Sequence, residues 1–283
     1  MDICAGIVLY NPSIEKLNKN ISAIISQVRK VVLVDNGSNN IKEIEQSLSL
    51  NSLFRNKIEI IKNQNNLGIG KALNQILDFS IREGFDWFLT LDQDSICRDG
   101  LVDKYITVIN QLSDYKIGQI TCNIEDEKLG EIEQEQFLNI DFIEVSSCIT
   151  SGCINNVKAV EKVGRFNEKL FIDGVDIEIS LRLREYGFSV LKINYDGLKH
   201  SLGEGRIVRF LGVNVPLTYH APWRSYYMRR NFIYIAKRYY SGIKKITSIL
   251  KQIGISVGTV FLEDHKADRI KYCTKGIIDG FKM

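Results

Sequence analysis

Short apolar runs and helix-like spacing alternate along the first hundred residues of the chain. The apolar runs lie at residues 3–10, 31–34, 58–61 and 87–91. Each ends in polar or turn-forming residues, as buried strands do. Apolar residues recur at three- and four-residue spacing over 14–28 and 73–81, which predicts two amphipathic helices. Strands alternating with helices predict a doubly wound α/β sheet that binds its ligand beyond the carboxyl ends of its strands.

The pattern beyond residue 125 is less regular. Residues 142–150 and 188–194 are apolar enough to predict strands. Residues 203–222 contain three glycines and two prolines with little helical patterning, which predicts a long loop. Residues 175–183 alternate as a strand would, yet they are rich in helix-forming residues and are followed by Gly187. The pattern leaves strand and helix open there.

Length and composition indicate an ordinary globular protein. The 283 residues suit one large domain or two closely packed ones, with 45% hydrophobic and 25% charged residues. The net charge of +3 is too small to indicate a nucleic-acid partner. The six cysteines match no zinc-binding spacing, and Met1-Asp2-Ile3 leads directly into a strand. We therefore expect reduced thiols and a cytoplasmic location.

Two C-terminal segments bear on membrane binding. Residues 246–262 are apolar, but Lys251 and Gln252 interrupt them and they fall short of the ~20 residues that span a bilayer, so we expect no clean transmembrane segment. Residues 232–240 mix aromatic with basic side chains and could face anionic lipid at a membrane surface. The alternative is a C-terminal helix that packs on the domain.

Asp92-Gln93-Asp94 follows the apolar run at residues 87–91. Two carboxylates where a buried strand meets solvent suit Mg²⁺ or Mn²⁺, and Mg²⁺ commonly combines one or two carboxylates with substrate phosphates. A diphosphate-bearing substrate is therefore the first hypothesis. The alternative is a polar turn after a strand.

Two further strand ends carry residues that suit a nucleotide. Asp35 could accept a hydrogen bond from a base or a ribose, or could form an Asx turn with Asn36-Gly37. Residues 65–74 could form a phosphate-binding helix N-terminus with Lys71, although they match neither of the common phosphate-loop motifs. A plain loop-to-helix junction is the alternative.

The second half supplies candidates for proton transfer and anion binding. Asp173 or Asp176 could be a general base, or both could belong to a helix N-terminus. His200 follows a strand-like run and could be a third metal ligand or a structural histidine. Arg224, Arg229 and Arg230 alternate with aromatic residues and could bind phosphate or form a solvated basic helix face.

Together, these pieces resemble the inverting family-two glycosyltransferases of the GT-A fold. The resemblance rests on the order of six weak motifs over about residues 3–235: Val-Asp-Asn-Gly-Ser, Asn-Leu-Gly, DxD, Thr-Ser-Gly, Gly-Val-Asp-Ile-Glu with a later His, and Tyr-Tyr-x-x-Arg-Asn. Within the family, Leu91-Asp92-Gln93-Asp94-Ser95 looks most like bacterial rhamnosyltransferases that build O-antigen or capsule from dTDP-L-rhamnose.

The resemblance implies a role for each matching residue. Asp35 would contact the base, Asp92 the ribose and metal, and Asp94 the metal together with His200. Asp176 would be the general base, although Gly174-Val175 replaces the usual adjacent acid, so Asp173 stays a rival. The expected donor-binding residues are Tyr10, Asp35, Gly68, Lys71, Asn74, Asp92 and Gln93, and those expected at the acceptor or diphosphate are Ser151, Gly152, Asp173 and Arg230.

The resemblance also implies a domain plan and a set of partners. Residues 1–225 would form the GT-A domain, with a nucleotide-sugar half (1–125) and an acceptor half (126–225), and residues 226–283 a helical extension. The donor would be dTDP-rhamnose or a UDP-sugar, the acceptor a glycan or polyprenyl-diphosphate-linked glycan, and the cofactor Mg²⁺ or Mn²⁺. Localisation would be cytoplasmic, with peripheral binding at the inner face of the cell membrane as an option.

Two other functions remain open from the sequence. An aspartyl phosphatase also places a DxD after an apolar strand, but its motif normally lies close to the N-terminus and continues with Gly-Thr, whereas here Ser95-Ile96 follows. A non-catalytic partner that binds nucleotide-sugars is the second. The retained candidate base, acidic pair and His200 argue against it.

Overall fold

A computed structural model describes residues 1–51, 54, 56–112, 115–126, 130–131, 141–200, 205–210, 213–218 and 220–283. By their internal contacts these fall into two compact units. Unit 1 comprises residues 1–169 and 176–201, and unit 2 comprises residues 170–175 and 202–283. Each unit is described by itself. The predicted functional division at residues 125 and 225 stays a prediction.

Unit 1 is built on a mixed sheet of ten described strands. The strands are β1 (Ile3–Leu9), β2 (Lys30–Asp35), β3 (Ile58–Lys62), β4 (Trp87–Asp92), β5 (Ile96–Cys97), β6 (Ile117–Asp126), β7 (Gly130–Glu131), β8 (Phe142–Glu144), β9 (Cys153–Asn156) and β10 (Ser189–His200). The main order is β3-β2-β1-β4-β9-β6-β10-β5, with β7 beside β6 and β8 beside β10. Neighbours from β3 to β4 are parallel, as are β6 and β10, whereas β9 runs antiparallel to β4 and β6.

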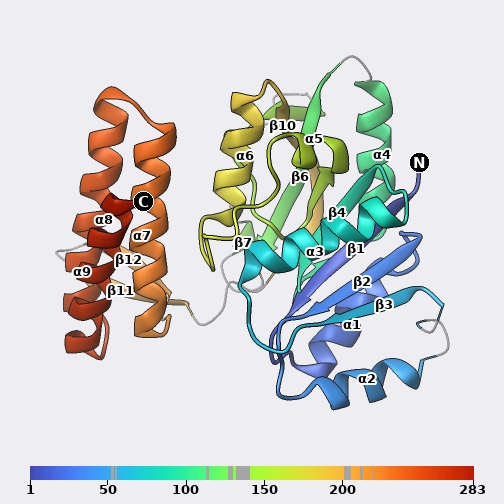
Figure 1. Cartoon of the computed structure of the whole chain (residues 1–283), viewed down its shortest axis with the longest axis horizontal. Coiled ribbons are helices and arrows are strands. Elements are labelled where there is room, and N and C mark those ends of the chain that lie inside the picture. The colour runs from blue at the N-terminus through green and yellow to red at the C-terminus, as the bar shows by residue number, and fades with distance from the viewer. Residues whose placement is uncertain are drawn as a thin grey trace. The chain divides into compact units, whose positions relative to one another are not determined.

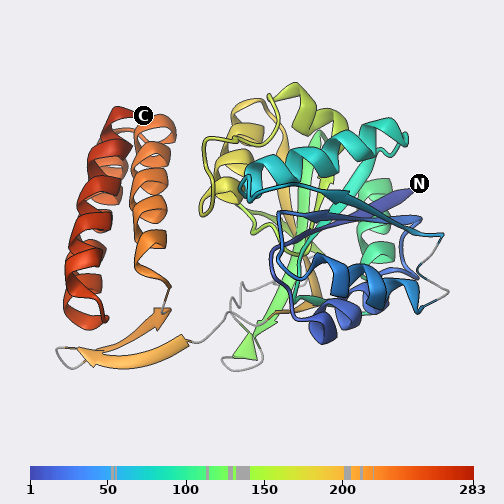
Figure 2. The same cartoon turned by 60° about the horizontal axis from the view of Figure 1, so that its bottom comes forward.

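Helices cover both faces of this sheet, as Figure 2 shows. They are α1 (Ile14–Ile24), α2 (Ile41–Ser49), α3 (Ile69–Arg82), α4 (Leu101–Gln111), α5 (Val157–Lys162) and α6 (Val175–Glu185). Apolar residues of α1, α2 and α4 join one buried cluster with one face of the sheet, including Ile21, Ile44 and Tyr105. The opposite face packs on α3, where the Ile76 side chain fills the space above Gly6. Burial on both faces explains why β1, β2 and β4 have continuous apolar runs in the sequence.

The structure decides the ambiguous segments of the second half. Residues 175–185 form helix α6, in which buried Ile179 and Leu183 face the sheet, so the strand reading is wrong. Residues 203–222 are not a long loop throughout, because β11 (Gly205–Phe210) and β12 (Val213–Thr218) pair as an antiparallel hairpin. Over residues 142–150 the strand is confined to β8.

Unit 2 consists of this hairpin and three helices, α7 (Pro222–Tyr239), α8 (Gly242–Leu262) and α9 (Lys266–Lys282) (Figure 1). The helical nature of the C-terminal segment is confirmed. Helices α7 and α9 approach closely because Gly276 and Gly280 lie against the α7 backbone, where a Cβ on Gly280 would come within 2.7 Å of the Arg230 carbonyl oxygen. Within the described ranges, α8 is by length and composition long and apolar enough to cross a membrane, and the expectation of no clean transmembrane segment stays a prediction.

Candidate functional site

Polar residues from distant parts of unit 1 meet at one edge of the sheet. Because β1, β2, β3 and β4 are parallel, their carboxyl ends lie together, and the antiparallel β9 begins at the same edge. Asp35 and Asp92 are the last residues of β2 and β4. Helix α6 leads into β10 through a short turn at the opposite edge, so the start of α6, with Asp176, also lies at the edge of the carboxyl ends.

Tyr10 and Gln93 connect the ends of β1 and β4. The Tyr10 amide donates to Gln93 Oε1 at 2.9 Å, and Gln93 Nε2 donates to the Tyr10 carbonyl oxygen at 3.4 Å. The Asn20 side chain, buried in α1, donates to the Asp92 carbonyl oxygen at 2.6 Å. These bonds fix the backbone of the Asp92-Gln93-Asp94 turn. The Tyr10 side chain remains half exposed beside it.

Ser151 supports the same turn from the start of β9. Its buried hydroxyl accepts a hydrogen bond from the Asp92 amide at 3.0 Å and lies 2.7 Å from the Ser95 hydroxyl. The Gly152 amide donates to the Thr90 carbonyl oxygen at 2.9 Å, and the buried Tyr105 hydroxyl donates to the Gly152 carbonyl oxygen at 2.5 Å. The Thr-Ser-Gly motif therefore positions the acidic turn. A direct contact of Ser151 or Gly152 with a substrate stays a prediction.

The acidic turn has the chemistry of a divalent-cation site that a substrate completes. The Asp94 carboxylate makes no hydrogen bond or ion pair to any residue that the structure describes. In that part of the chain no three His, Cys, Asp or Glu side chains gather as a metal-binding group. Backbone pairing brings the end of β10, at His200, to the same edge, but the His200 side chain lies outside the described part. Two carboxylates plus substrate phosphates and water suit Mg²⁺, so the residues present fit such an ion.

Asp35 forms the Asx turn that the sequence allowed. Its carboxylate accepts the amides of Gly37 and Ser38 at 3.2–3.3 Å, and the residue is 2% exposed. Asn36 then joins this turn to the loop after β3, because its Oδ1 accepts the Leu67 amide at 3.0 Å. The sequence predicts Asn36 only as a turn residue, and its link to the loop after β3 follows from the structure. A contact between Asp35 and a nucleotide base stays a prediction.

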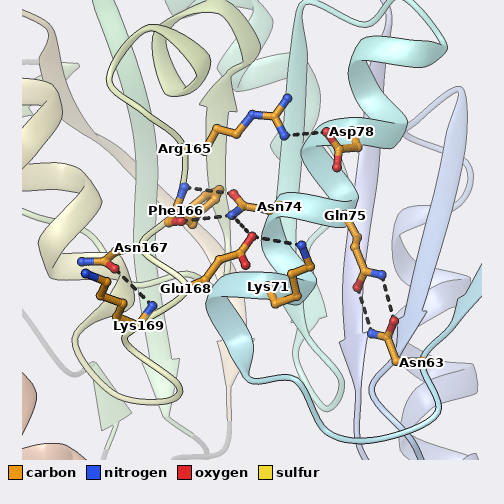
Figure 3. A network of polar contacts seen from close by, with 10 residues as sticks. All are labelled: Asn63, Lys71, Asn74, Gln75, Asp78, Arg165, Phe166, Asn167, Glu168 and Lys169. Carbon is orange, nitrogen blue, oxygen red and sulfur yellow. Dashed lines mark hydrogen bonds and ion pairs between the residues drawn. The ribbon is translucent and has the colours of Figure 1, made fainter.

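The N-terminus of α3 is tied to the segment after α5 by a network of polar contacts (Figure 3). Asn74, 4% exposed, accepts the Phe166 amide at 2.9 Å and donates to the Phe166 carbonyl oxygen at 3.0 Å. Its amide also reaches Glu168, which forms an ion pair with Lys71 at 3.3 Å. Gly68 begins the helix at φ 86°, a conformation that favours glycine. These contacts are structural, and donor binding by Gly68, Lys71 and Asn74 stays a prediction.

We expect the Asn74→Ala substitution to lower the free energy of unfolding by about 2–3 kcal/mol, because it leaves a buried backbone amide and carbonyl of Phe166 without partners. Urea unfolding without ligand measures this change. The matched control is Lys71→Ala on the same helix. It removes an exposed ion pair and is expected to cost at most about 1 kcal/mol. Equal losses for both variants would contradict the structural role of Asn74.

Asp176 lies in the first turn of α6, next to buried groups of the sheet. Its Oδ1 accepts the Ile177 amide at 2.8 Å, and its backbone oxygen accepts the Ser180 hydroxyl at 2.9 Å. The same hydroxyl lies 2.7 Å from Gln119 Oε1 of β6, so its one hydrogen is shared between these two acceptor oxygens. Glu178 is buried and pairs with Arg182 at 2.8 Å, so it serves structure and not proton transfer. The role of Asp176 as general base stays a prediction.

Cysteine chemistry is not a competing use of this site. All six cysteines are free and buried. The pKa of the Cys153 thiol is raised well above its ordinary value, mainly by burial and further by contacts with Cys148. Burial also raises the pKa of Cys122 to about 11 and that of Cys4 to about 12. Thiols with such pKa values stay protonated near neutral pH and are poor nucleophiles.

Residues 170–175 of unit 2 are anchored on α7. Arg224 holds the Asp173 carboxylate in two contacts of 2.7 and 2.9 Å, and Asn231 Nδ2 donates to the carbonyl oxygens of Ile172 and Asp173 at 2.8 and 2.7 Å. Arg230 stacks over Tyr227 with its guanidinium 4.9 Å from the ring centroid. The Tyr-Tyr-x-x-Arg-Asn motif therefore fixes the turn that precedes Asp176. Asp173 is therefore engaged in an ion pair, and its role as the rival base stays a prediction.

Sequence comparison identifies the family. Residues 4–164 match the profile of glycosyl transferase family 2. The chain belongs to glycosyl transferase family 2. It is also 29% identical over 297 residues to the dTDP-rhamnosyl transferase RfbF of Shigella flexneri, and the match covers 99% of this chain and 96% of that protein. As a family member the chain is a glycosyltransferase that uses a nucleotide-sugar. Neither the phosphatase nor the non-catalytic alternative gains support.

Solved structures confirm the fold. TarS of S. aureus superposes with a TM-score of 0.67 at 13% identity, covering all of this chain and 49% of TarS. TarS residues 1–349 in complex with UDP-GlcNAc give a TM-score of 0.66 at 14% identity, covering all of this chain and 81% of that one. GalNAc-T7 with UDP, GalNAc and Mn²⁺ gives 0.65 at 12% identity, with 56% of that chain covered. The predicted GT-A α/β fold with C-terminal helices is confirmed, and the predicted site residues remain untested.

Proposed function

We propose that this glycosyltransferase transfers L-rhamnose from dTDP-L-rhamnose to a hydroxyl of a glycan acceptor, with inversion at the anomeric carbon. The observation that carries the proposal is the 29% identity to dTDP-rhamnosyl transferase RfbF over nearly the full length of both chains. Two groups at one edge of the sheet support it further. The acidic turn lies at the carboxyl end of β4, and the candidate base lies at the start of α6.

The residues of the chain would divide the reaction between them. Asp35 and the loops beside it would hold the nucleoside, and Asp92 and Asp94 would lie at the diphosphate. The Asp176 carboxylate would accept the proton of the acceptor hydroxyl, whose oxygen attacks the anomeric carbon from the face opposite the leaving diphosphate. One displacement of this kind inverts the configuration, and its transition state has oxocarbenium character, as in glycoside hydrolysis.

A divalent cation would be held by Asp94 and Asp92, with His200 as the third predicted ligand. When bound, Mg²⁺ or Mn²⁺ would supply charge neutralisation of the leaving nucleoside diphosphate. The Ser151, Gln93 and Asn20 contacts would keep the acidic turn in place before the donor arrives. Roles for Arg230 and Asp173 at the acceptor or diphosphate stay predictions from their motifs.

The acceptor would be a glycan of a bacterial surface polysaccharide, carried on a polyprenyl diphosphate. The basic residues among the last sixty of the chain suit such an anionic carrier. A carrier in the membrane would bring the enzyme to the inner face of the cell membrane.

Donor preference tests the proposal. With Mg²⁺ or Mn²⁺ present, dTDP-L-rhamnose is expected to stabilise the protein more than UDP-GlcNAc does at equal concentration. A ligand at one hundred times its Kd adds about 2.7 kcal/mol to the stability of the native state, which a thermal melt resolves. Slow release of dTDP without acceptor should accompany binding. Stabilisation and hydrolysis with UDP-GlcNAc alone would overturn the rhamnose assignment while leaving the glycosyltransferase family intact.

A further inference from the structure

Helix α8 turns an apolar stripe away from its own unit. Its exposed apolar side chains recur every three or four residues, so they lie along one side of the helix. Six of them form this stripe, namely Ile243, Ile246, Leu250, Ile253, Val257 and Phe261, whereas Ile255, 39% exposed, lies off it. Ile243 is 80% exposed and Phe261 67%. A contiguous apolar surface of this kind marks a place where a protein contacts something else.

Polar side chains on the opposite side of α8 are covered by α7 and α9, together with partly buried Ile249. Gln252 Oε1 accepts a hydrogen bond from Arg229 of α7 at 3.0 Å. Ser256, which is buried, donates to the Gln252 carbonyl oxygen at 2.8 Å. At the end of the helix, buried Glu263 pairs with Arg269 of α9 at 2.5 Å. A helix on a water-soluble domain normally has the reverse arrangement, with its apolar side inward.

A shallow apolar groove continues the stripe onto α9. Its volume is about 280 Å³, and its lining includes Ile253, Val257, Val260, Phe261, Ile270 and Ile277. Helices α8 and α9 lie side by side in both views (Figures 1 and 2). Because Ile270 is 53% exposed, the apolar surface is wider than one helix. Such a groove suits lipid acyl chains.

The positive charge of residues 222–283 indicates which partner the apolar stripe of α8 contacts. Residues 222–283 contain thirteen Lys or Arg and four Asp or Glu, a net charge of +9 in a chain whose total is +3. Lys244, Lys245 and Lys251 lie in α8 itself, which has no acidic residue. A second copy of the chain would bring an equally positive surface against this one. An anionic bilayer would instead attract it, by about 1 kcal/mol for each basic residue near the membrane.

We propose that α8 binds the surface of an anionic membrane and lies in its plane, with the stripe from Ile243 to Phe261 inserted between lipids. The helix does not cross the bilayer, although its length would suffice. Crossing would carry the polar side, with Gln252 and the Arg229 and Glu263 contacts, into hydrocarbon, where polar and charged groups are costly. An amphipathic helix in the interface keeps that side on α7 and α9.

The inserted surface differs from the segment that the sequence suggested. Residues 232–239 of that segment fall in α7, where Ile233, Ile235 and Ala236 are buried. These three side chains pack inside the protein and therefore cannot contact lipid. The lipid-facing residues lie one helix further along the chain.

Flotation of the full chain with vesicles tests the proposal. We expect binding to vesicles of phosphatidylcholine with phosphatidylglycerol, and much weaker binding to phosphatidylcholine alone. The combined variant Ile246→Ser, Leu250→Ser and Phe261→Ser should lower the bound fraction at least about tenfold. Lys244→Gln with Lys251→Gln should reduce the preference for the anionic vesicles. The control is Leu50→Ser in unit 1, which removes an apolar side chain that is more exposed (82%) than those of the triple variant and should bind normally.

The same variants are used to check folding and to test two alternatives, a dimer formed through the stripe and an α8 that spans the membrane. An unchanged circular dichroism spectrum and unchanged melting temperature would show that the triple variant is folded, so that its loss of binding supports the proposal. Equal binding of wild type and triple variant would overturn it. A dimer by light scattering that the triple variant abolishes would assign the stripe to a second copy, and resistance to alkaline carbonate extraction from cell membranes would assign α8 a spanning role. None of these readouts uses the donor, so they are independent of the rhamnose proposal.

Discussion

Replacing Asp176 by Asn is expected to reduce turnover by about 10²–10⁴-fold, the usual contribution of a positioned general base. The amide is nearly isosteric, and its oxygen can still accept the Ile177 amide that Asp176 Oδ1 accepts at 2.8 Å. The start of α6 should therefore keep its structure. Donor affinity should change little, because the proton transfer concerns the acceptor hydroxyl. Steady-state rates and calorimetric donor binding, measured on the same preparation, check both parts.

Two comparison variants make the result specific. Asp78→Asn removes an exposed carboxylate that pairs with Arg165 on the outside of α3, and it should leave turnover unchanged. Asp173→Asn tests the rival base. Because Asp173 pairs with Arg224, this variant should lower stability and alter activity less than Asp176→Asn does. If Asp176→Asn turned over normally while Asp173→Asn did not, the base would be Asp173.

Three strands of the parallel half, β1, β2 and β4, could be predicted from the sequence because they are largely buried on both faces. Runs such as 31–34 have no solvent face, so their signal is continuous hydrophobicity that ends at Asp35. Short elements with little periodicity were harder to predict. The four-residue strand β9 has the polar residues Asn155 and Asn156 among its members, and its place between β4 and β6 follows from long-range pairing.

The residue types of the candidate site could be predicted from the sequence. The hydrogen bonds that their side chains make could not. Ser151 was expected at the diphosphate, and the structure shows its hydroxyl supporting the Asp92 amide. Asn74 was expected at the donor, yet its side chain is taken up by Phe166, ninety-two residues away. Contacts between such distant positions leave no periodic trace in the sequence. The exposure of the apolar stripe of α8 could not be predicted either. Hydrophobic periodicity identifies the apolar side of a helix but does not show whether that side is buried.

Replacing Asp94 by Ala is expected to weaken metal-dependent donor binding by about 10–100-fold or more, because removal of even an outer-shell partner costs a metal site that much. The Asp94 carboxylate has no partner among the residues that the structure describes, so its loss should not destabilise the fold. Calorimetry with dTDP-L-rhamnose measures the change in the presence of Mg²⁺, of Mn²⁺ and of a chelator.

Asp99→Ala is the matched control for Asp94→Ala, because it removes an exposed carboxylate five residues further along the chain and should bind donor normally. Chelator should lower the affinity of wild type to that of Asp94→Ala and should leave the variant unchanged, since both treatments remove the same interaction. Wild-type affinity in Asp94→Ala with metal present would exclude Asp94 from the metal site. The adjacent turn would then act through the backbone that Ser151 and Gln93 hold in place, and the diphosphate charge would have to be met by basic side chains instead.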